Sequence, residues 1–367
     1  MITCANPLAQ YSEQKEEILE AIKRVLDNGN YILGPEVDLF EKEFSSFLNV
    51  KYSVGLNSGT DAIILALKAL GIGRGDEVIT VSQTALATIS AIIAVGAVPV
   101  LVDIDPDYYT IDPDNIRKAI TSRTKAIIAV HLYGQSVDLN SILKIKSEYN
   151  LFLIEDCAQA TGATYQDHML GSLGDLGCFS FYPTKNLGAI GDGGMVVTNN
   201  PDYYQRIVKL RQYGWDEHRK TVEPGINSRL DEIQASILRI KLRKLNQDNL
   251  KRLEIAKLYN TELAKLPIVL PRARPGSNHV YHLYVIKSEK RYELKQFLQT
   301  KNILAGIHYI AAGHQHGGYS EICKFNEADL SVTCNLTSQA LSLPMYPELS
   351  HMEVREVCDS IKIFFKL

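Results

Sequence analysis

Between about residues 52 and 200, short β-branched runs alternate with stretches of helical periodicity, and this alternation constrains the fold most strongly. The runs predict strands at Tyr52–Leu56, Glu77–Val81, Val98–Val102, Ala126–Val130, Phe152–Glu155, Cys178–Phe181 and Met195–Thr198. The segments between them predict helices at Thr60–Leu70, Ala85–Val95, Pro113–Ile120 and Leu139–Tyr149. Nearly continuous apolar strands separated by helices indicate a parallel sheet covered on both faces, and therefore one large α/β domain.

The pattern changes after residue 200. Here the sequence predicts helices at Asp202–Arg211, Arg229–Leu245, Asn249–Leu266, Tyr292–Lys301 and His351–Phe364, with one strand at His282–Ile286. Two N-terminal helices, at Glu16–Leu26 and Val37–Phe47, are expected to pack near this second part. We expect a large α/β domain over residues 1–250 and a smaller α+β domain over residues 251–367.

The composition is that of a soluble globular chain, with 46% hydrophobic and 22% charged residues. The net charge of −3 and the lack of a long block of like charge do not support a nucleic-acid or membrane-surface role. Gly96 and Pro99 interrupt the uncharged stretch Thr84–Val102, so we expect no membrane span. The six cysteines form no CxxC pair, and no signal peptide is evident, which favours reduced thiols in the cytoplasm.

The segment Gly55–Asp61 links a predicted strand to a predicted helix. Its small residues let backbone amides face an anion at the helix N-terminus, where the helix dipole adds to the attraction. Thr60 has a hydroxyl that can either cap the helix or donate to a phosphate. Anion binding and a plain capping turn both remain open for this segment.

Two further motifs follow predicted strands. Phe152–Gln159 ends its strand in Glu155 and Asp156, and only one of these adjacent carboxylates can face a given pocket. We select Asp156, because Gln159 follows on the next turn with a similar orientation. Lys185 follows another strand just beyond a proline and precedes a glycine-rich segment, an arrangement that fits an amine nucleophile. A solvated acidic pair and an exposed lysine are the alternatives.

Together these motifs supply the parts of a pyridoxal phosphate site: a phosphate cradle, a partner for the ring nitrogen and a Schiff-base lysine. The sequence resembles the DegT/DnrJ/StrS family of sugar aminotransferases, a branch of the fold-type I pyridoxal phosphate enzymes. The resemblance covers most of the chain and includes Tyr31–Val37, Asn57–Ala62, Glu155–Ala160, Ser180–Lys185, Gly191–Gly194 and Gly225–Ala235. It implies a mostly parallel seven-stranded sheet in the large domain and a smaller α+β C-terminal domain.

The resemblance also implies roles for single residues. Lys185 would form the Schiff base and move protons, and Asp156 would pair with the ring nitrogen, an attraction of about 4 kcal/mol at about 4 Å and an effective dielectric near 20. Gln159 would contact the ring hydroxyl. The phosphate would be bound by Gly59, Thr60, Ser180 and, from the neighbouring subunit, Asn227. Because Asn227 would bind the phosphate in the neighbouring subunit, the resemblance also implies a homodimer with shared active sites.

The chain departs from the family pattern in two places. An aromatic residue that stacks on the cofactor ring in many members is replaced by Ala85, and Leu86 is a less specific cover for the ring. The segment His308–Tyr319, which usually borders the sugar, also differs. The residues considered for substrate contact are Tyr31, Tyr182, His308, Tyr309 and His314. We expect no metal site, because no carboxylate or cysteine lies at a convincing spacing from His314 and His316.

These features predict an aminotransferase that uses pyridoxal 5′-phosphate, with pyridoxamine phosphate as the intermediate form. The expected donor is L-glutamate, and the expected acceptor is a nucleotide-linked keto-6-deoxysugar, with dTDP-3-keto-6-deoxyhexose preferred. A 4-keto nucleotide sugar, a UDP or GDP sugar, or a keto-cyclitol are alternatives. A regulatory protein on the same fold, or a pyridoxamine-dependent dehydratase, is less well supported because Lys185 and Asp156 are both present.

Overall fold

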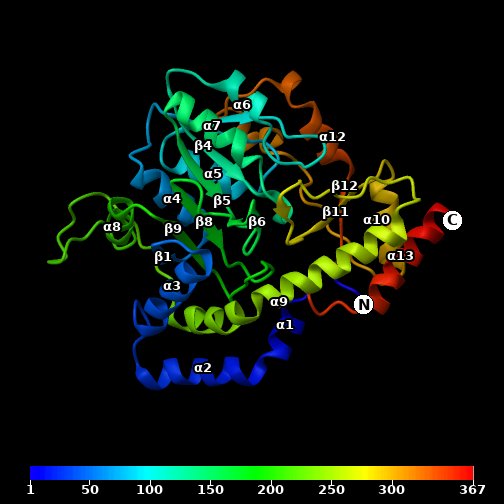
Figure 1. Ribbon diagram of the computed structural model, residues 1–367, viewed down its shortest axis with the longest axis horizontal. Coiled ribbons are helices and arrows are strands. Elements are labelled where there is room, and N and C mark those ends of the chain that lie inside the picture. Colours follow the sequence, from blue (N-terminus) through cyan, green and yellow to red (C-terminus); the bar gives the residue numbers. More distant parts are fainter. Residues whose placement is uncertain (367) are drawn as a thin grey trace.

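The protein is described by a computed structural model over residues 1–366 and is built around a seven-stranded sheet in the order β1–β9–β8–β5–β4–β2–β3 (Figure 1). The strands are β1 (Tyr52–Leu56), β2 (Glu77–Val81), β3 (Val98–Val102), β4 (Thr124–Val130), β5 (Phe152–Asp156), β8 (Leu176–Ser180) and β9 (Gly194–Thr198). Only β9 runs antiparallel to its neighbours, β1 and β8. The predicted mostly parallel sheet is therefore confirmed.

Helices join the strands and cover the sheet. They are α3 (Pro35–Leu48), α4 (Gly59–Ala69), α5 (Leu86–Ala94), α6 (Pro113–Ala119), α7 (Leu139–Tyr149) and α8 (Pro201–Leu210). Their buried side chains join those of the strands in one hydrophobic core, in which Phe44 of α3 makes edge contacts with Phe179 and Phe181. Burial of this apolar surface is the main stabilising force of the fold.

A second hydrophobic core lies toward the C-terminus. It is formed around β11 (Tyr284–Lys287) and β12 (Ala340–Leu343), which pair antiparallel, and by α10 (Arg291–Thr300) and α13 (His351–Phe365). α12 (Ser331–Gln339) leads into β12. Ile2 also enters this core, next to Ile303, so the start of the chain belongs to it.

One long helix, α9 (Glu232–Leu263), runs through both cores (Figure 1). Leu238 and Leu245 belong to the first core, whereas Ile255 and Tyr259 belong to the second. The prediction of two helices here was wrong. The domain boundary expected between residues 250 and 251 falls inside α9, between the residues of the first core and those of the second. We propose that the two domains meet at this point of the helix.

The remaining elements are short or peripheral. α1 (Pro7–Glu13) leads into α2 (Lys15–Asn28), and α2 and α3 both pack along α9. Ile18 and Ala21 of α2 contact Ile237 and Ile240 in the first half of α9. The other short elements are β6 (Thr164–Tyr165), β7 (His168–Met169), β10 (Ser277–Asn278), α11 (Gly317–Ser320) and the 3₁₀ turns Leu132–Gly134, Gly313–Gln315 and Glu327–Asp329. Among residues 1–366, no helix has both the length and the apolar character needed to cross a membrane.

Candidate active site

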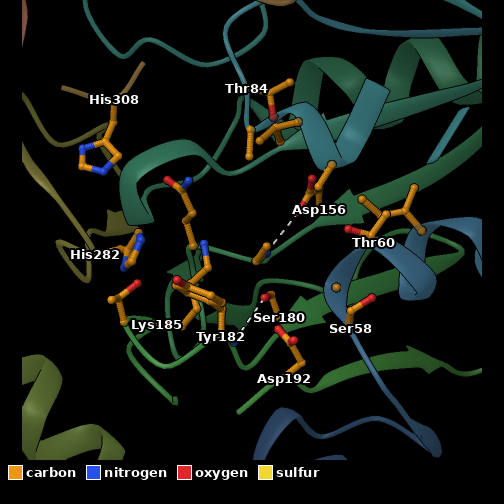
Figure 2. A pocket seen from close by; sticks show the side chains of 18 of the residues that line it. Ser58, Thr60, Thr84, Asp156, Ser180, Tyr182, Lys185, Asp192, His282 and His308 are labelled. Carbon is orange, nitrogen blue, oxygen red and sulfur yellow. Dashed lines mark hydrogen bonds between the residues drawn. The ribbon is translucent and has the colours of Figure 1, made fainter. Parts of the chain in front are cut away.

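The carboxyl ends of β1, β2, β5 and β8 meet at one edge of the sheet and border a cavity of about 340 Å³ (Figure 2). Open α/β sheets place their ligands at this edge. The lining of the cavity is completed by His282, which precedes β11, and by His308 and Tyr309, which lie between α10 and α12. Residues far apart in the sequence therefore face the same space.

The turn after β1 forms one wall of the cavity. Ser58 caps α4, since its Oγ accepts from the backbone N–H of Asp61 at 3.1 Å and its carbonyl accepts from that of Ala62. The first residues of the helix, Gly59 and Thr60, have N–H groups with no acceptor inside the helix, and both residues line the cavity. A Cβ atom at Gly59 would lie only 2.6 Å from the Cβ of Ser180, so the turn has to approach β8 without a side chain.

The two acidic residues at the end of β5 have separate surroundings. Glu155 is fully buried and accepts hydrogen bonds from His131 Nε2 at 3.0 Å and from the backbone N–H groups of Gly171, Leu173 and Gly174 at 2.6–2.9 Å. It thus organises the loop that leads into β8. Of the pair, only Asp156 lines the cavity.

Asp156 is held by two hydrogen bonds. Its Oδ2 accepts from Thr88 Oγ1 at 2.8 Å, and its Oδ1 accepts from the backbone N–H of Ala158 at 3.2 Å. Burial raises the pKa of this carboxyl, while both hydrogen bonds and the charge of Lys185 act in the opposite direction.

Lys185 lies in the loop that follows β8, where its backbone N–H donates to the carbonyl of Tyr182 at 2.8 Å. Its half-buried side chain lines the same cavity as Asp156 (Figure 2). Burial lowers the pKa of this amine to about 8, and the charge of Asp156 limits the decrease. The cavity therefore holds an amine that is easily deprotonated and a carboxylate of opposite charge.

Gln159 connects the edge of the sheet to the segment that contains His308 and Tyr309. Its Nε2 donates to Tyr309 Oη at 2.8 Å, and its Oε1 accepts from the backbone N–H of Tyr133 at 2.8 Å. His308 is held by Ser342, with Nδ1 and Oγ 2.8 Å apart, and burial together with the charge of Lys185 lowers its pKa to about 4. These contacts place neutral polar groups opposite the end of β5.

The structure brings together most of the residues selected from the sequence. The cavity is lined by Gly59, Thr60, Asp156, Gln159, Ser180, Tyr182, Lys185, His308 and Tyr309. Asn227 and Tyr31 are exposed and do not line it. His314 is buried elsewhere, with Nδ1 2.6 Å from Ser82 Oγ.

Other cavity residues were missed or misjudged from the sequence. His282 was not selected from the sequence, yet it lines the cavity and its buried Nδ1 has no hydrogen-bond partner among residues 1–366. No local pattern marks this histidine, because the long-range packing of β11 brings it to the sheet. Ala85, which replaces the aromatic residue of many family members, borders the cavity together with Ala87. Leu86, the residue considered as a less specific cover for the cofactor ring, does not line the cavity.

One buried group of potential metal ligands occurs among residues 1–366, namely His131, Glu155 and Cys157. Glu155 already accepts the four hydrogen bonds described above, which occupy its oxygens. Burial raises the pKa of the Cys157 thiol well above its usual value. These contacts give the group a structural role.

Comparison with known proteins identifies the family. The DegT/DnrJ/EryC1/StrS aminotransferase family matches residues 12–362. The chain belongs to this family. The resemblance inferred from the sequence motifs is therefore confirmed, and the protein is a sugar aminotransferase.

Relatives of this aminotransferase match over nearly the whole chain. The dTDP-3-amino-3,6-dideoxy-alpha-D-galactopyranose transaminase of Aneurinibacillus thermoaerophilus is 46% identical over 347 residues, which cover 95% of each chain. The crystal structure of S. venezuelae DesV in complex with a ketimine intermediate matches with a TM-score of 0.97 and 40% identity, over 100% of this chain and 99% of that one. NtdA from Bacillus subtilis with bound cofactor PMP matches with a TM-score of 0.90 and 35% identity, over 97% and 82% of the two chains.

Proposed function

We propose that this aminotransferase transfers the amino group of L-glutamate to a nucleotide-linked 3-keto-6-deoxyhexose, with dTDP as the nucleotide and pyridoxal phosphate as the cofactor. The observation that carries the proposal is the convergence of Lys185, Asp156 and the N-terminus of α4 on one cavity. The name of the Aneurinibacillus relative supports the sugar, and the cofactor bound to NtdA supports pyridoxal phosphate or its amine form.

The residues of the cavity fit this cofactor. The N–H groups of Gly59 and Thr60, the hydroxyl of Ser180 and the positive end of the α4 dipole form a cradle for a phosphate dianion. The close approach of Gly59 to Ser180 leaves no room for a side chain at residue 59. Asp156 would hold the ring nitrogen, and Gln159 would lie at the ring hydroxyl.

When bound, pyridoxal phosphate supplies an aldehyde that accepts the amino group and a ring that withdraws electrons from the reacting carbon. Lys185 would hold the cofactor through its amine. Once released, its Nζ would take the α-proton of the amino donor and return it to the cofactor carbon. Its pKa of about 8 suits both steps, since both forms of the amine are present near neutral pH. Asp156 keeps a negative charge beside the ring nitrogen and so favours its protonated form.

The sugar would enter beside Tyr182, which is 52% exposed at the cavity, and contact His308 and Tyr309. Burial keeps His308 neutral, so it offers hydrogen bonds rather than charge. We further propose a cytoplasmic homodimer in which Asn227 of each chain reaches the phosphate of the neighbouring site. Its exposure outside its own cavity is consistent with such a role.

The absorbance spectrum of the purified protein, before and after addition of L-glutamate, tests the proposal. We expect a yellow band that bleaches with glutamate and returns only with the accepted ketosugar, so that dTDP, UDP and GDP sugars can be compared. The variant Lys185→Ala should not form this band, whereas Lys23→Ala, on the exposed face of α2, should behave like the wild type. A protein that stays colourless after incubation with pyridoxal phosphate would contradict the proposed chemistry.

A further inference from the structure

Two threonine hydroxyls connect the wall of the cavity to Asp156. Thr84 lies two residues before α5 and Thr88 lies in its first turn, with their Oγ1 atoms 2.9 Å apart. Thr88 Oγ1 is 2.8 Å from Asp156 Oδ2. All three residues are at least nine-tenths buried, with exposed fractions of 3%, 0% and 5% for Thr84, Thr88 and Asp156. Thr84 and Asp156 line the cavity (Figure 2), whereas Thr88 is not among the lining residues.

The number of hydrogens fixes the direction of this chain. A hydroxyl has one hydrogen to donate, and an ionised carboxylate can only accept. When Asp156 is ionised, Thr88 gives its hydrogen to Oδ2 and must then accept from Thr84. The three groups form a directed chain, Thr84 to Thr88 to Asp156, which would have to reverse or break if Oδ2 carried the proton.

We propose that Thr88, oriented by Thr84, is a positioning residue that holds Asp156 ionised and correctly turned toward the pyridine nitrogen. This inference rests on the proposed function, because it assigns the carboxylate to that nitrogen. It extends the site by two threonines, one just before α5 and one in its first turn, that do not take part in the transfer itself.

The surroundings of Asp156 explain why such support is needed. Burial alone raises its pKa, and a neutral carboxyl would no longer favour the protonated ring. The hydrogen bond from Thr88 opposes this effect more than any other contact, ahead of the Ala158 N–H and the charge of Lys185. The other titratable groups that face Asp156 or adjoin it are His131, Glu155, Cys157, Cys178 and Tyr309.

The contacts leave the carboxylate free to act. Its two oxygens offer about four acceptor positions, of which Thr88 and the Ala158 N–H use one each. The remaining positions are available to a donor in the cavity. Because one contact comes from α5 and the other from the turn that follows β5, the carboxylate cannot rotate without losing a hydrogen bond.

The test compares Thr88→Val, which keeps the shape but lacks the hydroxyl, with Thr88→Ser, which keeps the hydroxyl. Thr80→Val is the matched control, since Thr80 is buried in β2 and donates to the carbonyl of Ile128 at 3.0 Å, away from Asp156. The first readout is the carboxyl infrared band of Asp156 in the apo-protein, identified with Asp156→Asn and followed against pH. The second is the dissociation constant of pyridoxal phosphate, measured by fluorescence quenching.

For Thr88→Val we expect the midpoint of the Asp156 titration to rise by about one pH unit and the dissociation constant to increase about tenfold, as for loss of a hydrogen bond to a charged group. Thr88→Ser should restore both values, and Thr80→Val should lower thermal stability without changing either. If Thr88→Val does not fold, Thr84→Val should shift both readouts in the same direction by a smaller amount.

Wild-type values for both readouts in a folded Thr88→Val or Thr84→Val protein would overturn the inference. Equal shifts in Thr80→Val would do the same, because the effect would then be a general loss of packing. A wild-type protein that does not bind pyridoxal phosphate would instead reject the proposed function, and the infrared titration would separate that result from a lack of coupling between Thr88 and Asp156.

Discussion

Lys185 shows how the fold changes the chemistry of a common side chain. An exposed lysine has a pKa near 10.4 and is almost fully charged at neutral pH. In this cavity burial lowers the pKa to about 8, and Asp156 limits the decrease by favouring the charged form. The residue therefore combines a reactive neutral amine with a readily available proton.

This environment predicts a pH dependence for the apo-protein. The neutral amine is the reactive form, so acylation of Lys185 by a limiting reagent should rise with pH and reach half its maximum near pH 8. Mass spectrometry of the peptide that contains Lys185 would follow the reaction. In the urea-unfolded chain the midpoint should move to about 10.4, the value of an unperturbed lysine. Asp156→Asn should lower the midpoint of the folded protein further, and a folded midpoint near 10 would contradict the assignment.

Residues at strand ends were easier to select from the sequence than residues in loops. Asp156 and Ser180 end buried strands, and Lys185 follows one of them by five residues. The sheet brings the carboxyl ends of its parallel strands to one edge, so these positions can be expected to lie together. The positions of His282 and His314 depend on how the C-terminal part of the chain packs against the sheet. Nothing in the local sequence indicates which of these two histidines faces the cavity. His314 was selected from the sequence, but His282 is the one that lines the cavity.

At the scale of single elements, α3 has an unusual N-terminus. It begins after Gly34, which has no side chain to cap it. Glu232, the first residue of α9, replaces the cap, since its buried carboxylate accepts from the backbone N–H groups of Gly34, Glu36 and Val37 at 2.8–3.0 Å. One side chain therefore satisfies three N–H groups and ties the two helices together.

Removal of this cap should be costly. Glu232→Ala leaves three backbone donors without their acceptor, and we expect a loss of about 3 kcal/mol in the free energy of unfolding. Urea denaturation followed by circular dichroism would measure it. As a control, Arg243→Ala removes the exposed ion pair that joins α9 to Glu17 of α2 and should cost under about 1 kcal/mol. Equal losses in the two variants would rule out the capping role.

The accuracy of the predicted elements depended on how local their determinants are. The strands Tyr52–Leu56, Glu77–Val81 and Val98–Val102 were predicted to the residue, because strands buried within a sheet are continuous apolar runs. The break predicted within α9 was wrong because a polar stretch interrupts the apolar pattern there. Asn249 in that stretch is buried and bonded to Asn186 and to the Thr161 carbonyl, contacts that only tertiary structure reveals. β12 was missed because its pairing with β11 spans distant sequence.

At the scale of the whole molecule, the proposed dimer makes a prediction that mixing experiments can check. If each site uses Lys185 of one chain and Asn227 of the other, a heterodimer of Lys185→Ala and Asn227→Ala chains has one intact site. Mixing the two inactive or weakened proteins under exchange conditions should restore up to about a quarter of wild-type activity, because half of the dimers are mixed and each has one of two sites. Activity that only averages the two variants would show that the sites are not shared.

The passage of α9 through both cores limits how this enzyme can be divided or recombined. An exchange of the C-terminal part with that of a relative must be spliced within a continuous helix, and an inserted or deleted residue there would rotate every following side chain by about 100°. Ile255 and Tyr259 would then turn away from the core they fill. Chimaeras should therefore be tolerated only when the crossover preserves the length of α9, because that length fixes how the side chains after the crossover are oriented toward the second core.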